Sequence, residues 1–271
     1  MNINNHILTN GNIPFVKSPN HSGLFEAGNL DTIIIHYTAG SSASSSIRTL
    51  TDPNAKASAH LVVAADGSIT QLVPFNTIAW HAGASQYQGR SGFNKYSIGI
   101  EIDNPGLLEK SGDKFVAWFG KGYEEKDVIE AVHRNQNTPK FWHRYTDTQI
   151  QIVEEICRLL IEDYKIKFIL GHEEISPGRK TDPGPAFPLD KMRDRLFGLG
   201  RDFDGAEENT SVEKFVNADG LNIRSQPNYD AEKVARPLPQ GKKVCVLETK
   251  GGWSKVKTEI TGWVAEKYLI S

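Results

Sequence analysis

A run of glycine and polar residues at 198–210 constrains this chain more than any other feature, because it separates two parts of different character. The run holds three glycines and four acidic residues and few apolar ones. Such a composition is typical of a flexible linker and not of a packed core. We therefore expect two domains, at 1–198 and 212–271, joined by a linker at 199–211. A part of about 200 residues is long enough to bury a sizeable core.

The composition of the whole chain is that of an ordinary globular protein. Apolar residues make up 38 % and charged residues 24 % of the sequence, and the formal net charge is −2. This balance gives no electrostatic reason to expect nucleic acid or an anionic membrane as a partner. The two cysteines, Cys157 and Cys245, fall in different predicted domains, so we expect no structural disulfide.

The N-terminal residues lack the charged start and the apolar core of a signal peptide. No apolar run reaches the roughly 20 residues that are needed to cross a bilayer. The sequence therefore predicts no transmembrane segment and a cytoplasmic location, unless lysis or a dedicated secretion route releases the protein. It leaves the oligomeric state open.

The first part mixes strand and helix patterns. The nearly continuous β-branched run at 32–37 and the run at 97–102 predict buried strands, and Asp66-Gly67 predicts a hairpin between strands at 59–64 and 68–73. A capping box at 146–149 opens a helix, and a strand follows at 167–170. This pattern predicts an α/β domain with a mixed central sheet flanked by helices. Glycines and a proline interrupt 104–145, which we interpret as a long surface insertion. The apolar face of the predicted helix is Ile150, Val153, Cys157, Leu160 and Tyr164.

The second part consists of short alternating runs separated by turn residues such as Asp219-Gly220 and Gly251-Gly252. Short strands at this spacing, without a helical period, predict a small all-β barrel. Residues 211–271 hold ten Lys and Arg against seven Asp and Glu, a net charge of about +3, so 1–210 carry about −5. The predicted strands lie at 214–216, 221–224, 243–247, 253–256 and 262–265.

Three potential zinc ligands end or follow predicted strands of the first part. His36 ends the strand at 32–37, His172 directly follows the strand at 167–170, and Asp182 lies ten residues later in a proline-rich loop. Catalytic zinc sites usually take three protein ligands from His and carboxylate groups and leave the fourth position to water. A histidine after a strand is more often a hydrogen-bonded structural residue, so spacing alone leaves both interpretations open.

The sequence around these residues resembles a known family. The stretch from Gly171-His172 through Arg179-Lys180-Thr181-Asp182-Pro183-Gly184 is similar to the signature of the zinc-dependent N-acetylmuramoyl-L-alanine amidases. This is the amidase-2 family, which is related to T7-type lysozyme and the peptidoglycan recognition proteins. The run at 84–90 is similar to the cytosolic, peptidoglycan-recycling branch. Further matching stretches occur in the family's order, at 35–39, 58–60, 79–83 and 97–101.

The resemblance implies roles for individual residues. His36, His172 and Asp182 would hold one zinc ion, Glu101 would be the general base, and Lys180 would stabilise the oxyanion on the attacked carbonyl. Glu101 lies between Ile100 and Ile102 and so faces the other side of its strand. Without the family, Glu101 could be a solvated strand residue and Lys180 a surface charge on a loop. The residues that the resemblance places around the substrate are His81, Trp80, His60 and Tyr37.

Of these four residues, Trp80 could equally pack in the core, and His60 could be a structural histidine.

The second part resembles a bacterial SH3-like (SH3b) domain at Leu221-Asn222-Ile223-Arg224, Gly251-Gly252-Trp253 and Gly262-Trp263-Val264. Such a domain implies binding to cell-wall peptides or a docking role between proteins.

Together these resemblances predict hydrolysis of the amide between N-acetylmuramic acid, or its 1,6-anhydro form, and L-alanine of the stem peptide. The partners would be peptidoglycan or muropeptides. A peptidoglycan sensor that has lost catalysis and a zinc peptidase that cuts within the stem peptide are the alternatives. The recycling-type run favours soluble anhydro-muropeptides, whereas the SH3b-like part favours the polymeric wall, as in a bacteriolytic endolysin or effector.

Overall fold

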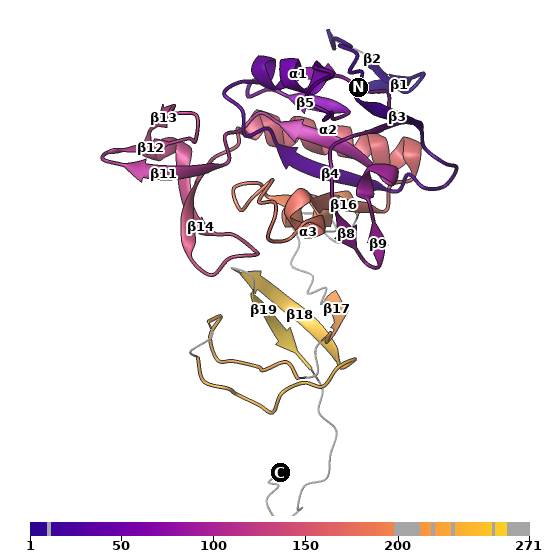
Figure 1. Cartoon of the computed structure of the whole chain (residues 1–271). Helices are drawn as coiled ribbons and strands as arrows, with labels where there is room; N and C mark the ends of the chain where they lie inside the picture. The colour runs from indigo at the N-terminus through magenta and orange to yellow at the C-terminus, as the bar shows by residue number, and fades with distance from the viewer. Residues whose placement is uncertain (10–11, 198–211, 218–219, 229–230, 251–252, 259–271) are drawn as a thin grey trace, which may run out of the picture. The chain divides into compact units, whose positions relative to one another are not determined.

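The computed structural model describes residues 1–9, 12–197, 212–217, 220–228, 231–250 and 253–258 (Figure 1). The chain divides into two compact units, Met1–Asp202 and Phe203–Ser271. The predicted linker at 199–211 lies outside the described residues. None of the described helices is long and apolar enough to cross a membrane. Cys157 and Cys245 are both free thiols, as expected.

A five-stranded sheet forms the centre of the first unit, with the strand order β16-β4-β10-β5-β6. The first four strands run parallel, and only β6 is antiparallel to its neighbour β5. The predicted strands at 32–37 and 97–102 are confirmed to the residue. The bounds are β16 (Phe168–Gly171), β4 (Thr32–Tyr37), β10 (Ser97–Ile102), β5 (Leu61–Val63) and β6 (Ile69–Gln71).

Helix α2 (Asp147–Tyr164) covers one face of this sheet and confirms the predicted amphipathic helix (Figure 1). Thr146 and Gln149 form the capping box, in which the Thr146 hydroxyl accepts from the Gln149 backbone N–H. Val153, Cys157 and Leu160 are buried against Ile33 and Ile35 of β4 and against Ile98, Ile100 and Ile102 of β10. The alternate residues of these strands therefore face the opposite side, where His36 and Glu101 lie.

That opposite side is covered by shorter elements. Helix α1 (Ala43–Thr51) packs on β5, and α3 (His172–Ile175) directly continues β16. Helix α4 (Leu189–Leu196) follows the proline-rich loop and packs beside α2, on the first side of the sheet. Smaller pairs and turns complete the unit: β1 (Asn2–Asn4) with β2 (Ile7–Thr9), β3 (His21–Leu24) with β7 (Thr77–Ala79), β8 (Gln86–Tyr87) with β9 (Arg90–Ser91), and the 3₁₀ turn η1 (Phe93–Lys95).

The stretch at 104–145, interpreted from sequence as a surface insertion, forms a second five-stranded sheet with its own small core. All its strand pairs are antiparallel, in the order β13-β12-β11-β15-β14. Leu108, Phe115 and Val128 are buried in its core. The glycines that interrupt the sequence lie at turns, since Gly112 and Gly120 have positive φ. Its elements are β11 (Leu107–Ser111), β12 (Lys114–Val116), β13 (Gly122–Tyr123), η2 (Glu125–Asp127), β14 (Val128–Val132) and β15 (Pro139–His143).

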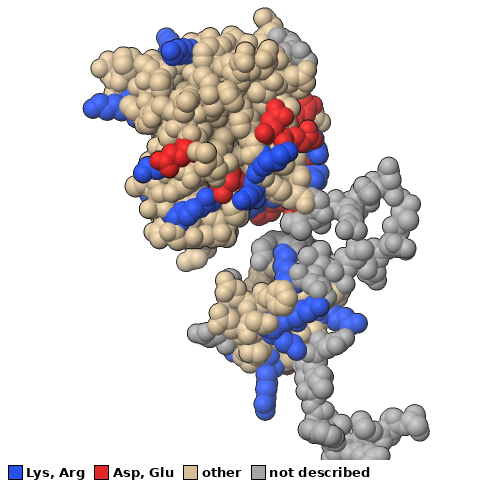
Figure 2. Space-filling model, turned by 90° about the vertical axis from the view of Figure 1, so that its right-hand side faces the viewer, with Lys and Arg blue, Asp and Glu red and all other residues tan. Residues whose placement is uncertain are grey.

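The described part of the second unit is a three-stranded antiparallel sheet of β17 (Val212–Phe215), β18 (Lys243–Lys250) and β19 (Trp253–Lys257). Val216, Leu238 and Val244 form its buried core, as a small all-β barrel requires. The run predicted as a strand at 221–224 forms only isolated bridges, at Leu221 and Arg224. The predicted strand at 262–265, with Trp263, lies outside the described residues. The face of this unit seen in Figure 2 displays Lys and Arg side chains and no described Asp or Glu.

Candidate metal centre and its cleft

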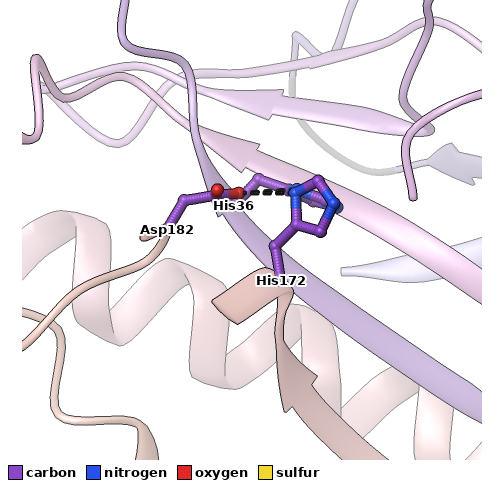
Figure 3. Close-up of side chains that lie close together, drawn as sticks. All are labelled: His36, His172 and Asp182. Carbon is purple, nitrogen blue, oxygen red and sulfur yellow. Dashed lines mark hydrogen bonds and ion pairs between the residues drawn. The ribbon is translucent and has the colours of Figure 1, made fainter. Parts of the chain in front are cut away.

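His36, His172 and Asp182 meet at the carboxyl ends of two neighbouring parallel strands (Figure 3). His36 lies near the end of β4, and His172 follows β16, whose last residue Gly171 is in register with Ile35. Asp182 reaches the same point from the proline-rich loop. All three residues are buried. The carboxyl ends of parallel strands meet at one edge, so the sheet topology explains why residues 146 positions apart in sequence become neighbours.

The three side chains present one atom each to a common point. His36 Nδ1, His172 Nδ1 and an Asp182 carboxylate oxygen, Oδ2, lie 2.9 Å from one another, so they form an equilateral triangle. A point about 2 Å from all three, the usual distance from zinc to a nitrogen or oxygen ligand, exists above this triangle. Two imidazoles and one carboxylate also form a common catalytic zinc ligand set. The residues therefore fit a zinc ion.

Hydrogen bonds on the far side of the two rings set the tautomers that a metal requires. His172 Nε2 lies 3.0 Å from the Ala82 carbonyl oxygen, which can only accept, and 3.3 Å from Arg179 Nη2, which itself donates to that oxygen. We assign the proton to Nε2 because the carbonyl oxygen is its nearer partner. His81 Nε2 donates to the Ser97 carbonyl oxygen, at 3.2 Å. His81 Nδ1 therefore accepts from His36 Nε2, at 3.0 Å. Both Nδ1 atoms that face the common point are left with a free lone pair.

The electrostatics of the site favour a neutral His36 ring and an ionised Asp182 carboxylate. Burial, together with the neighbouring His172, lowers the pKa of His36 to about 4. Burial and the adjacent His36 also lower the pKa of His81 well below its ordinary value. Burial acts to raise the pKa of Asp182, but the contacts with His172 and His36 outweigh it and hold that pKa below its usual range. Neutral imidazoles and an ionised carboxylate are the forms that bind metal.

Glu101 lies beside this group, because it is in register with His36 on the adjacent strand β10. Its side chain is partly exposed, yet its carboxylate oxygen Oε2 is buried and has no hydrogen-bond partner among the described residues. Burial and the nearby Asp182 charge raise the pKa of Glu101 well above its ordinary value, while Lys180 opposes the shift. Lys180 lies two residues before Asp182 in the proline-rich loop, and its positive charge acts to lower the pKa of both His36 and Glu101. Lys180 itself is partly exposed.

The four residues predicted to surround the substrate occupy different places. His81 lies behind His36, as described above, in a space that Gly99 leaves open because a side chain there would overlap the His81 ring. The Tyr37 hydroxyl is 2.6 Å from Thr181 Oγ1, and burial raises the pKa of Tyr37 to about 12.

His60 is fully buried. It donates to the Thr77 carbonyl oxygen and accepts from the Gly99 backbone N–H. Trp80 is partly exposed, donates to Ser22 Oγ at 2.5 Å, and lines a separate hollow. The structure therefore joins His81 directly to the metal-ligand residues. Tyr37 reaches them through Thr181, and His60 through His81, since the His60 and His81 ring centroids lie 5.9 Å apart. Trp80 lies apart from them.

A buried ion pair that the sequence analysis missed ties the second sheet to the metal-ligand residues. His133, just after β14, contacts Glu173 of α3 at 2.6 Å, and Arg134 Nε contacts the other Glu173 oxygen at 2.8 Å. Glu173 also accepts from the Gly184 backbone N–H. Its own backbone N–H donates to the Asp182 carbonyl oxygen. Glu173 thus connects the insertion to both ligand-bearing segments. Its only sequence signal is its position next to His172.

The sequence analysis also missed the cleft that leads to Glu101. This cleft of about 360 Å³ lies between the start of α1 and the tip of the second sheet. Trp118 and Phe119, between β12 and β13, supply its aromatic wall. An aromatic pair between the glycines of a predicted insertion was the available signal.

Two protein-family models match this chain. The Amidase_2 family model, described as N-acetylmuramoyl-L-alanine amidase, matches residues 26–185, and a bacterial SH3 domain model matches residues 219–270. The chain belongs to the Amidase_2 family.

One curated relative is the 1,6-anhydro-N-acetylmuramyl-L-alanine amidase AmpD of Escherichia coli strain K12, 37 % identical over 140 residues. The match covers 51 % of this chain and 57 % of that protein, so it spans little more than half of the relative's length. N-acetylmuramoyl-L-alanine amidase A of Achromobacter lyticus is 38 % identical over 176 residues, covering 64 % of this chain and 88 % of the relative. A crystal structure of selenomethionine AmpD superposes with a TM-score of 0.51 at 29 % identity, covering 71 % of this chain and 98 % of that one.

Proposed function

We propose that this protein is a zinc-dependent amidase. It hydrolyses the amide between the lactyl carbonyl of N-acetylmuramic acid, or of its 1,6-anhydro form, and the amino group of L-alanine. The observation that carries the proposal is the triangle of His36, His172 and Asp182 beside Glu101, in a chain whose family has this activity by name. A sensor without catalysis would have no need of a complete ligand triangle.

Zinc held by these three residues would supply Lewis acidity, which polarises a carbonyl group and acidifies water. Glu101 is the general base: it takes a proton from the attacking water and returns it to the departing L-alanine nitrogen as the C–N bond breaks. Its unpartnered Oε2 leaves an acceptor position for that proton. The Lys180 ammonium stabilises the negative charge that develops on the carbonyl oxygen. Replacing Lys180 by Ala should lower kcat by about 10²-fold and leave the zinc content unchanged.

His81 is a positioning residue in this proposal, because it accepts from His36 Nε2 and so holds the His36 lone pair toward the metal. Tyr37 acts similarly through Thr181, which precedes Asp182. Direct contacts of His81, Tyr37, His60 and Trp80 with the substrate stay predictions from the sequence.

The decisive experiment is product analysis with the full chain and a purified anhydro-muropeptide. The amidase releases a peptide with a free L-alanine amino terminus, which mass spectrometry after amino-group labelling identifies. A peptidase that cuts within the stem would leave L-alanine on the muramyl group, and a sensor would bind without releasing anything. Chelation should stop the reaction and added zinc should restore it; full turnover after complete metal removal would overturn the zinc proposal.

The second unit would bring the enzyme to its substrate. Its Lys- and Arg-bearing face would be attracted to an anionic wall polymer, and salt would weaken that attraction (Figure 2). We infer that polymeric peptidoglycan is a substrate in addition to soluble muropeptides. Comparing the rates of hydrolysis of intact sacculi and of soluble muropeptides tests this inference. Activity on sacculi would also count against the cytoplasmic location that the sequence predicts, because the polymeric wall lies outside the cytoplasm.

A further inference from the structure

Trp118 is 78 % exposed, yet its indole is anchored at the wall of the cleft. Its Nε1 donates to the Ala39 carbonyl oxygen at 2.7 Å. The Phe119 ring stands perpendicular to the indole, with 5.6 Å between the centroids. An indole of this exposure has unburied ring surface, and its few rotatable bonds make it a low-entropy contact residue.

The loop that contains Ala39 is hydrogen-bonded to the insertion at two points, of which Trp118 is one. Ala39 has a φ of 50°, in the left-handed region, which a residue with a side chain seldom adopts. Its backbone N–H donates to the Asn104 carbonyl oxygen, while its own carbonyl accepts from Trp118. The first and the middle parts of the insertion thus fix this loop, which forms the cleft wall next to Glu101.

The wall opposite the indole is rich in hydroxyl groups. Ser45 and Thr49 are four residues apart on α1 and so lie on the same side of the helix, and Ser41 joins the lining just before the helix begins. Among the described residues that line the cleft, Glu101 is the only charged one. The lining itself therefore offers no Lys or Arg side chain to an acidic stem peptide. A pyranose ring suits the cleft better, because its C–H face packs on an aromatic ring and its hydroxyls pair with Ser and Thr.

We propose that Trp118 is a specificity-determining residue of the amidase site, whose indole face packs against the N-acetylmuramyl ring of the substrate. This inference rests on the proposed function, since the sugar ring is the part of the substrate that adjoins the scissile amide. The cleft volume of about 360 Å³ is at the small end of ligand sites and suits one sugar residue. The insertion then serves the active site as a sugar-recognition wall.

The test uses the full-length zinc protein and the variants Trp118→Ala and Trp118→Phe. Val132→Ala is the control. Val132 is an aliphatic residue, half-exposed on the same sheet, and it does not line the cleft. The first measurement is saturation-transfer NMR with N-acetylmuramic acid alone, which needs no catalysis. We expect the wild type and the control to bind the sugar, Trp118→Phe to bind it more weakly, and Trp118→Ala to lose the signal.

The second measurement is the kinetics of hydrolysis of N-acetylmuramyl-L-alanyl-D-glutamate. Trp118→Ala should raise KM by about tenfold with kcat within twofold, as expected for loss of a contact made equally in ground and transition states. An unchanged KM and an unchanged sugar signal in Trp118→Ala would overturn the inference while leaving the amidase intact. If the wild type bound the sugar through Trp118 but hydrolysed nothing, the proposed function would fail and the sugar site would stand. Trp118→Phe keeps an aromatic ring at this position. An intermediate KM in this variant would show that the loss in Trp118→Ala comes from the missing ring and not from misfolding.

Discussion

The two sheets of the first unit contribute to the candidate site in different ways. The parallel sheet carries His36 and Glu101 in register on adjacent strands and delivers His172 from the next strand along. The antiparallel sheet at 107–143 carries no metal-ligand residue. It reaches the site from outside, through the pair of His133 and Arg134 with Glu173 and through Trp118 at the cleft.

The parallel sheet therefore carries residues proposed to act in the reaction, and the antiparallel sheet carries residues that support them. Residues on the parallel sheet have their positions set by strand register, which allows little variation without flipping side chains to the wrong face. Residues of the insertion act through ion pairs and loop contacts, which adjust the ligands and the cleft. Substitutions in the first sheet should therefore remove catalysis, and those in the second should change metal affinity, stability or specificity.

The largest effect should come from the metal-ligand residues. His36→Ala, His172→Ala and Asp182→Ala should each lose zinc and reduce turnover by about 10³-fold or more, because two ligands hold zinc poorly. Metal analysis by mass spectrometry and a muropeptide assay measure the two losses. Lys110→Ala, an exposed position on the insertion, is the control and should keep both properties.

The next largest effect should come from Glu101, and it distinguishes a general base from a metal ligand. Glu101→Gln keeps the shape of the side chain but cannot take up a proton, so kcat should fall by about 10² to 10⁴. Zinc content should stay at the wild-type level. Loss of zinc would make Glu101 a ligand or a support, and a near-full rate would mean that another group moves the proton.

A smaller effect should follow from cutting the connection between the two sheets. Glu173→Gln leaves Arg134 and His133 without their buried partner, which should destabilise the fold by about 3 kcal/mol. Because the Glu173 carboxylate also accepts from the Gly184 backbone N–H, two residues after Asp182, zinc affinity should fall by about 10- to 100-fold. Thermal unfolding and a competitive zinc titration measure the two changes.

Glu124→Gln removes an exposed partner of Lys126 and provides the control, which should unfold at the wild-type temperature. If Glu173→Gln bound zinc as tightly as the wild type, the insertion would support stability alone.

The smallest effect on the chemistry should come from removing the second unit. A chain ending at residue 202 keeps every candidate site residue and the whole first unit. Its rate on soluble muropeptides should stay within about twofold, whereas its sedimentation with sacculi should weaken. Loss of activity on the small substrate would place part of the second unit in the active site.

Periodicity and local motifs were enough to predict the parallel strands, the capped helix and the side of β10 on which Glu101 lies. The reason is that alternation and capping depend on residues within a few positions of each other. Strand ends and spacing proposed His36, His172 and Asp182 as potential zinc ligands, and the family motifs decided for that interpretation. One atom of each side chain lies 2.9 Å from one atom of each of the other two. This arrangement arises only because the strands that carry or precede these residues pack side by side.

Tertiary packing alone decided what the insertion does. Its short strands pair across turns at Gly112 and Gly120, so no single window of sequence displays the sheet that they form. The contacts of His133 with Glu173, and of Trp118 with Ala39, join residues 40 and 79 positions apart. Contacts over such distances are selected by the fold's total burial and hydrogen bonding, and therefore exist only once both sheets have formed.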